Sequence, residues 1–191
     1  IILQQFCPGC YESSARNVIR RLIAQGWIGK AVFAGQQKYL LLDKRGILAC
    51  RSDPRQRVQF SDFTVPGFFA VLYYCIRTGH ERLTQGDLRA IEPDFDHPSV
   101  WGAAHYVRQT NCGPSLGCFR IDSGLSPRRL VSRAETLVAK RYHLPKFREL
   151  IEAGHFNVTF LTAYPSMVEA TQQEIAERHR GPTAFYVELV P

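Results

Sequence analysis

Hydrophobic residues recur at helical spacing near the start of the chain. Between Tyr11 and Gln25 the apolar positions fall three or four residues apart, as in an amphipathic helix with one buried face. These positions are Ala15, Val18, Ile19, Leu22 and Ile23. Gly26 supplies a helix stop signal, and Pro8-Gly9 supplies a tight turn. We therefore predict a helix over residues 11–25, preceded by the end of an earlier helix at residues 1–6.

The pattern changes after Gly26 to two short strand-like segments, Lys30–Phe33 and Lys38–Leu42. Residues 34–37 join them as a hairpin-type connection, and residues 43–46 lead into a short helix or loop. A helix, a glycine, a hydrophobic pair and a hairpin, in that order, are typical of a winged helix-turn-helix. We predict this domain over residues 1–50.

Residues 51–64 are mostly polar and contain Pro54, so we predict a linker there. The remainder, residues 65–191, alternates helical and strand patterns. Helices are predicted at 68–77, 83–91, 127–142, 144–153 and 165–178, and strands at 100–108, 118–122, 156–162 and 184–190. An acidic loop at 92–98 and a turn at Gly113-Pro114 complete the pattern. The fold class is therefore α/β (α+β), with a second domain after the linker.

Charge is distributed unevenly along the chain. The net charge is +7, and residues 1–57 carry all of it, with ten Lys or Arg against three acidic residues. The rest of the chain has fourteen residues of each sign. A basic module joined to a neutral body is the electrostatic pattern of a nucleic-acid-binding protein.

The longest apolar run, residues 68–76, is far shorter than a membrane-spanning helix requires. Nothing at residues 1–6 resembles a secretory signal. We therefore expect no membrane partner and a cytoplasmic location.

The helix and the hairpin together predict how double-stranded DNA is bound. Arg pairs bidentately with guanine and Asn with adenine in the major groove, so Arg16, Asn17 and Arg20 are candidates for reading bases. Ser13 or Ser14 caps the helix or holds a phosphate near its N-terminus. The hairpin tip lies along the DNA backbone or in the minor groove. The DNA-binding candidates are Ser13, Ser14, Arg16, Asn17, Arg20, Arg21, Lys30, Gln36, Gln37 and Lys38.

Two stretches resemble known families. Residues 13–46, SSARNVIRRLIAQGWIGKAVFAGQQKYLLLDKRG, resemble the winged helix of many bacterial regulators and plasmid proteins. Residues 118–175, which begin CFRIDSGLSPRRL, resemble the replication-relaxation family of plasmids and other mobile elements. The second resemblance implies that the winged helix is joined to a domain related to the restriction-endonuclease fold.

A restriction-type nuclease needs an acid at the end of one strand and a Glu/Asp-x-Lys on the next, which together hold Mg²⁺ and activate water. The resemblance places one acid at position 120, which is Arg120 here, and the other on the strand at 100–108, which has no carboxylate. Asp122 remains, without a Lys two residues later, and it equally suits a cap for the turn at Ser123-Gly124. We therefore expect a non-catalytic domain.

Alternatives stay open for the second domain. The remaining candidates for a metal site are Asp94, Asp96 and His97 of the acidic loop and His105 after it, whereas short acidic loops are more often only solvated. A relaxase would use a tyrosine nucleophile, and the candidates are Tyr106, Tyr142 and Tyr164.

The cysteines offer a zinc alternative. Cys7-x-x-Cys10 has zinc-knuckle spacing, and Cys112 and Cys118, with Cys50 or a histidine, are the further ligands available. The competing interpretation is a turn at Pro8-Gly9 with cysteines packed as small residues, as for Cys75 in its apolar run. We expect no cofactor, with zinc or magnesium as the alternatives.

The sequence thus predicts specific binding of duplex DNA, by a regulator or accessory factor of plasmid or mobile-element replication, transfer or transcription. A homodimer on a palindromic site is a partner hypothesis, formed through residues 68–76 or the neutral body. The alternatives are a metal-dependent nuclease or relaxase acting on plasmid DNA, and a protein–protein adaptor whose winged helix no longer binds DNA.

Overall fold

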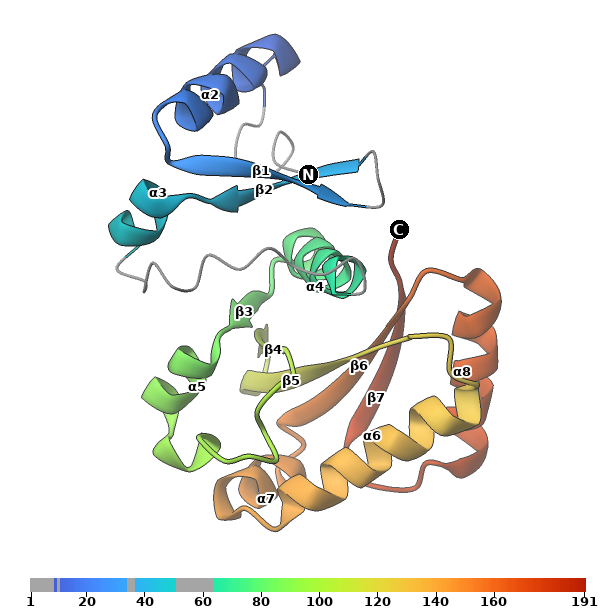
Figure 1. The fold of residues 1–191 in the computed structure, drawn as a ribbon. Coiled ribbons are helices and arrows are strands. Elements are labelled where there is room, and N and C mark those ends of the chain that lie inside the picture. The colour runs from blue at the N-terminus through green and yellow to red at the C-terminus, as the bar shows by residue number, and fades with distance from the viewer. Residues whose placement is uncertain (1–8, 10, 34–36, 51–63) are drawn as a thin grey trace. The chain divides into compact units, whose positions relative to one another are not determined.

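The computed structural model describes Gly9 and residues 11–33, 37–50 and 64–191. The chain divides into two compact units, residues 1–68 (unit 1) and 69–191 (unit 2). Both contain helices and strands, with a two-stranded sheet in unit 1 and a five-stranded sheet in unit 2 (Figure 1). The mixed α and β class is therefore confirmed. The predicted linker lies outside the described residues except for Thr64.

Unit 1 begins with helix α2, Glu12–Ala24. Its N-cap is Tyr11, which makes no side-chain capping bond, so the prediction that Ser13 or Ser14 caps the helix is wrong. The helix starts one residue after Tyr11, at Glu12, whose negative charge suits the first turn. Both serines therefore fall inside that turn.

Helix α2 ends in a Schellman arrangement at Gly26. The amide of Trp27 donates to the carbonyl oxygen of Leu22 at 2.9 Å, and the amide of Gly26 donates to that of Ile23 at 3.0 Å. Gly26 has φ 72°, a left-handed conformation that glycine adopts without strain. The stop predicted at this glycine is confirmed.

Strands β1 (Ile28–Phe33) and β2 (Gln37–Leu42) form an antiparallel hairpin, paired from Ile28 with Leu42 to Phe33 with Gln37. Helix α3 (Lys44–Ala49) follows, capped by the carboxylate of Asp43, which accepts from the amide of Lys44 at 2.7 Å. The segment predicted as a short helix or loop is therefore a helix.

Unit 2 is built on one mixed sheet in the order β3-β4-β5-β6-β7. Pairing is antiparallel from β3 to β5 and parallel from β5 to β7. The strands are β3 (Glu81–Leu83), β4 (His105–Thr110), β5 (Gly113–Ile121), β6 (Phe156–Thr162) and β7 (Ala184–Leu189). The helices are α4 (Val65–Thr78, whose first residues belong to unit 1), α5 (Gln85–Ile91), the 3₁₀ helix η2 (Pro93–Phe95), α6 (Pro127–Tyr142), α7 (Pro145–Glu152) and α8 (Pro165–Arg178).

The hairpin of β4 and β5 differs from its prediction. Residues 100–104 are not a strand. Val100 is fully buried, as its apolar side chain suggested, but it lies in a turn and not on the sheet. Strand β5 starts at Gly113, so the turn lies at Asn111 and Cys112 and not at Gly113-Pro114. Strand β3 was not predicted, since three residues with two adjacent charges carry no alternating pattern.

The sheet of unit 2 buries a different cluster on each face, with α4 on one side and α6 on the other (Figure 1). The α4 cluster joins Ala70, Val71, Tyr74, Cys75, Tyr106, Phe119, Leu161 and Val190. The larger α6 cluster joins residues from α5, η2, α6 and α7, such as Leu88, Phe95, Val131 and Phe147, to Cys118, Val158 and Phe160 of the sheet. Helices on both faces explain why every residue of β6 is buried.

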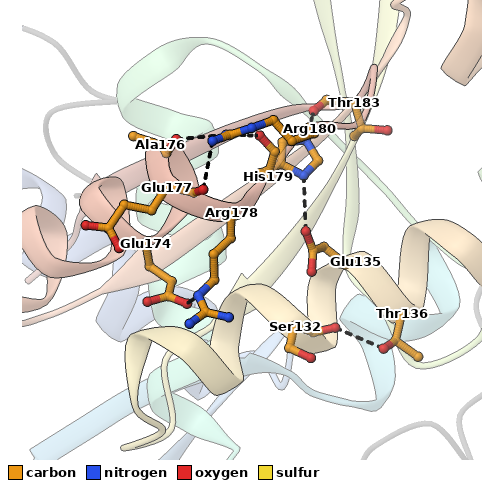
Figure 2. A network of polar contacts seen from close by, with 10 residues as sticks. All are labelled: Ser132, Glu135, Thr136, Glu174, Ala176, Glu177, Arg178, His179, Arg180 and Thr183. Atoms are coloured by element: carbon orange, nitrogen blue, oxygen red, sulfur yellow. Dashed lines mark hydrogen bonds and ion pairs between the residues drawn. The ribbon is translucent and has the colours of Figure 1, made fainter.

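Figure 2 shows the polar contacts that fix the C-terminal end of α8. The Nε2 atom of His179 lies 2.7 Å from the carbonyl oxygen of Thr183, and its Nδ1 atom lies 3.5 Å from a carboxylate oxygen of Glu135 in α6. Because a carbonyl oxygen only accepts, Nε2 carries a hydrogen. Arg180 donates to the carbonyl oxygen of Ala176 at 2.9 Å. These residues hold α8 against α6 and the start of β7.

Candidate nucleic-acid interface

Helix α2 has one apolar side and one exposed polar side. Ala15 is buried, and Ile19, Leu22 and Ile23 are partly buried on the same side. Ser13, Asn17 and Arg20, which recur every three or four residues, are exposed and fall on the opposite side of the helix. Val18, predicted as part of the apolar stripe, is 46% exposed, because it lies at the border between the two sides. The helix therefore presents a hydroxyl, an amide and a guanidinium in one row.

The arginines of α2 are not equivalent. Arg16 forms an ion pair with the carboxylate of Glu12, one turn earlier, and both side chains are exposed. Arg20 and Arg21 are exposed and have no acidic partner among the described residues. Ser14 is exposed in the first turn, next to Ser13. Arg20 and Arg21 are thus the guanidinium groups of α2 that are available to an external anion.

The hairpin carries two lysines on one face. Lys30 opposes Leu40 and Lys38 opposes Val32 in the register. Opposed residues share a face of the sheet, so both lysines project from the same side, where both are exposed. Gln36 lies outside the described residues, and of Gln37 only the backbone, at the start of β2, is described.

Arg45 of α3 was not singled out from the sequence, and it has a structural role. Its Nη1 atom donates to the carbonyl oxygen of Gln25 at 3.0 Å, and its guanidinium lies 5.7 Å from the centre of the Trp27 ring. Next to it, a Cβ atom on Gly46 would lie 2.2 Å from the carbonyl oxygen of Trp27. Arg45 and Gly46 therefore fix α3 against the junction of α2 and β1.

In unit 2, Asp122 has the hydrogen bonds of a turn cap. One carboxylate oxygen accepts from the amide of Gly124 at 2.9 Å, and the other accepts from the hydroxyl of Thr162 at 2.9 Å. Arg120, two residues earlier, is partly buried at the end of β5. Burial, together with the neighbouring Arg133 and Arg141, lowers the pKa of Arg120. The position where the nuclease pattern requires a second acid is therefore occupied by a cation among cations.

The acidic loop is engaged in local contacts. Asp96 pairs with Arg89 and accepts from the indole nitrogen of Trp101 at 3.0 Å. His97 contacts Ser99 through Nδ1 at 2.9 Å, and Asp94 is exposed. His105 is buried in β4, well away from solvent, at 1% exposure. Across the described ranges, no group of three His, Cys, Asp or Glu side chains is placed to hold a metal ion.

The three tyrosines differ in accessibility. Tyr106 is fully buried, and its hydroxyl contacts Asn157 and Thr159. Burial raises the pKa of Tyr106, which opposes formation of a nucleophilic phenolate. A hydrogen bond to Glu152 raises the pKa of Tyr142. Tyr164 is 62% exposed at the N-cap of α8. Among the described residues, no base contacts the hydroxyl of Tyr164.

The cysteines of the zinc alternative are only partly described. Cys7 and Cys10 lie outside the described residues. Cys112 is exposed in the turn before β5, whereas Cys118 is buried five residues beyond Gly113, about 17 Å along the strand at ~3.4 Å per residue. Cys50 is exposed at the end of α3, and Cys75 is buried in α4. Cys112 and Cys118 therefore do not meet at one metal ion.

Among the helices in the described part of the chain, none has the length and apolar character needed to cross a membrane. Comparison with protein-family models, curated proteins and solved structures found no match to the chain.

Proposed function

We propose that unit 1 binds double-stranded DNA as a winged helix-turn-helix, with α2 in the major groove and the hairpin against the backbone. The observation that carries this proposal is the exposed row of Ser13, Asn17 and Arg20 on the side of α2 opposite its apolar residues. Asn pairs with adenine and Arg with guanine through two hydrogen bonds each, so this row has the groups needed to read base edges.

The exposed cations around this row support binding to phosphates. Arg21 on α2 and Lys30 and Lys38 on the hairpin have no acidic partners among the described residues. Such cations neutralise phosphates without reading sequence, and they supply much of the affinity of DNA-binding proteins. Base reading and phosphate binding thus come from different side chains of the same unit.

For unit 2 we propose the role that the family resemblance implies, a restriction-endonuclease-like body that contributes to binding and not to cutting. Asp122 supports this role, since both carboxylate oxygens accept hydrogen bonds from its own turn and from Thr162. The biological context we propose is regulation or assistance of plasmid or mobile-element replication, transfer or transcription.

Selection of bound genomic fragments tests the proposal and identifies the target site. The variants Asn17→Ala and Arg20→Ala are each expected to weaken binding to the selected site by roughly 5- to 150-fold, about 1–3 kcal/mol per base contact, and to relax preference at one base position. Lys44→Ala is the matched control, because Lys44 is an exposed cation on α3. It is expected to leave base preference unchanged.

Two results would overturn the proposal. Failure of the full chain to enrich any duplex fragment would remove DNA binding itself. Unchanged affinity in the Asn17→Ala and Arg20→Ala variants would remove α2 as the reader. Nicking of supercoiled plasmid in Mg²⁺ that depends on Asp122 would instead establish the nuclease alternative.

A further inference from the structure

The N-terminal half of α6 carries a concentration of positive charge that the small net charge of unit 2, +1, conceals. A polar pocket of about 490 Å³ opens there. It is lined by Ser126, Arg128, Arg129, Ser132 and Arg133. All three arginines are exposed, and residues 123–134 contain no acidic residue. None of the three has an acidic partner among the described residues.

Two further arginines belong to the same part of unit 2. Arg120, at the end of β5, is close enough to Arg133 and Arg141 to be affected by their charges, and its Nε atom is buried without a hydrogen-bond partner in the described part of the chain. Arg141, later on α6, is completely buried, with its guanidinium 5.2 Å from the centre of the Phe147 ring. None of its three guanidinium nitrogens has a hydrogen-bond partner among the described residues.

These cations repel one another, and burying a guanidinium without a counter-charge lowers the stability of the fold. An anion bound among the exposed arginines offsets their mutual repulsion. The only carboxylate between residues 97 and 134 is Asp122, and its oxygens are already engaged by Gly124 and Thr162. Asp122 is therefore not available to these arginines, and an external anion would compensate their charge.

We propose that Arg120, Arg128, Arg129 and Arg133, here called the α6 arginine surface, bind phosphate groups of duplex DNA. The identity of the partner rests on the function proposed for unit 1, and the surface provides a second set of phosphate contacts on unit 2. It extends the electrostatic part of DNA binding beyond the basic first third of the sequence.

The chemistry of the surface selects a phosphate backbone over other nucleic-acid features. Guanidinium groups bind phosphate bidentately, and the hydroxyls of Ser126 and Ser132 add donors of the kind that contact phosphate oxygens. The pocket lining has no aromatic side chain on which an unpaired base would stack, and no carboxylate or amide to read a base edge. We expect its arginines to contact phosphates and not guanine, so that binding to this surface is independent of sequence.

The test compares two double variants of the full chain that each remove two positive charges. Arg129→Gln/Arg133→Gln changes the α6 arginine surface. Lys140→Gln/Lys146→Gln is the control, since Lys140 is exposed at the far end of α6 and Lys146 forms an exposed pair with Glu149 on α7. Circular dichroism and thermal unfolding establish that both remain folded, as expected for changes at exposed positions.

The readout is the dependence of DNA affinity on salt. The plot of log K against log salt concentration has a negative slope, and each lost phosphate contact makes it shallower by about 0.9. The slope of the arginine variant is therefore expected to be less steep than that of the wild type by about 2. Base preference stays unchanged, and the control keeps the wild-type slope. An arginine variant with the wild-type slope would overturn the proposal and leave the function of unit 1 standing.

A second probe separates the two proposals. In the full chain, inorganic tripolyphosphate is expected to shift the backbone amide resonances of residues 124–133, and the Arg129→Gln/Arg133→Gln variant is expected to abolish these shifts. If tripolyphosphate shifts these resonances but the chain binds no duplex, the α6 arginine surface is an anion site and the function proposed for unit 1 is wrong. If polyglutamate shifts these resonances and tripolyphosphate does not, the surface binds acidic protein and the phosphate proposal is wrong.

Discussion

Tyr106 and Gly117 are directly opposed across the antiparallel pair of β4 and β5, and the ring of Tyr106 occupies the space above the glycine. A Cβ atom on Gly117 would lie 2.2 Å from the Cζ atom of that ring. Tyr106 cannot move aside, because it is fully buried and its hydroxyl is held by Asn157 and Thr159. The pair fixes the register of the hairpin and the position of a buried aromatic ring.

Gly117→Ala is therefore expected to destabilise unit 2 by about 1–3 kcal/mol, the usual cost of forcing an extra carbon into a packed core. Urea unfolding of the two proteins measures the difference. Gly86→Ala is the control. Gly86 lies in helix α5, and a Cβ atom there would lie an unstrained 3.6 Å from the hydroxyl of Thr84, the N-cap of that helix. An equal effect of the two substitutions would show that the Tyr106 ring does not exclude a side chain.

His105 makes the stability of unit 2 depend on pH. Burial, assisted by the charge of Arg141, lowers the pKa of His105 to about 3 in the folded protein, below the ordinary value near 6.5. Between these values the unfolded chain binds a proton that the folded chain does not, so acid favours unfolding. The free energy of unfolding is expected to fall by up to about 1.4 kcal/mol per pH unit as the pH drops from 6.5 towards 3.

His105→Gln removes this contribution, so its urea-unfolding profile is expected to depend less on pH between 4 and 6.5. The difference between the two profiles isolates the histidine from the carboxylates that titrate in the same range. Parallel profiles would mean that His105 is protonated equally readily in both states.

The cysteines of unit 2 are expected to differ sharply in reactivity. Cys112 is exposed, whereas Cys118 is completely buried and burial raises the pKa of Cys75 to about 11. Since the thiolate is the nucleophile, iodoacetamide at neutral pH should modify Cys112 and leave Cys75 and Cys118 intact in the folded protein. Peptide mapping by mass spectrometry measures each site, and denaturant should make all three react. Rapid modification of Cys118 without denaturant would contradict its burial.

Asp122→Ala is expected to cost about 1–3 kcal/mol of stability, because the amide of Gly124 and the hydroxyl of Thr162 each lose an acceptor. Asp122→Asn, which keeps one carbonyl oxygen, should cost less. Affinity for the selected duplex should remain, since neither variant changes unit 1 or an arginine of the α6 surface. If the wild type cleaved DNA in Mg²⁺ and the Asp122 variants lost this activity while keeping wild-type stability, Asp122 would instead be catalytic.

Much of the secondary structure follows from local sequence signals. The helix at 11–25 and the one at 127–142 are found within a residue of their predicted bounds, because their apolar periodicity and the flanking Gly26 and Pro127 act locally. Strand β3 and the start of β5 escaped prediction, since both depend on pairing with β4, which lies elsewhere in the chain. Val100 was misassigned because apolar residues also fill buried turns.

The candidate site shows the same division between local and tertiary information. Exposure of Asn17 and Arg20 follows from the helical repeat, so the sequence identifies them. The i,i+4 spacing of Glu12 and Arg16 is a sequence signal for their ion pair, whereas no sequence pattern shows that Arg45 is held by Gln25, twenty residues away. The α6 arginine surface was missed because Arg120 and Arg133 come together only when α6 packs on the sheet, and because a net charge of only +1 for unit 2 hides a local excess.

The parallel pairing of β5 with β6 also has a consequence for the kinetics of folding. Strands β4 and β5 are joined by a two-residue turn, so their hairpin can form on a microsecond timescale. Helices α6 and α7 lie between β5 and β6 in the sequence. Pairing of β6 with β5 therefore closes a long loop of chain, which is slower than forming a hairpin. We therefore expect the α6 arginine surface, which needs α6 packed on the sheet, to be completed after the hairpin. A ligand that requires this surface should prolong the lifetime of the native state more than it accelerates folding.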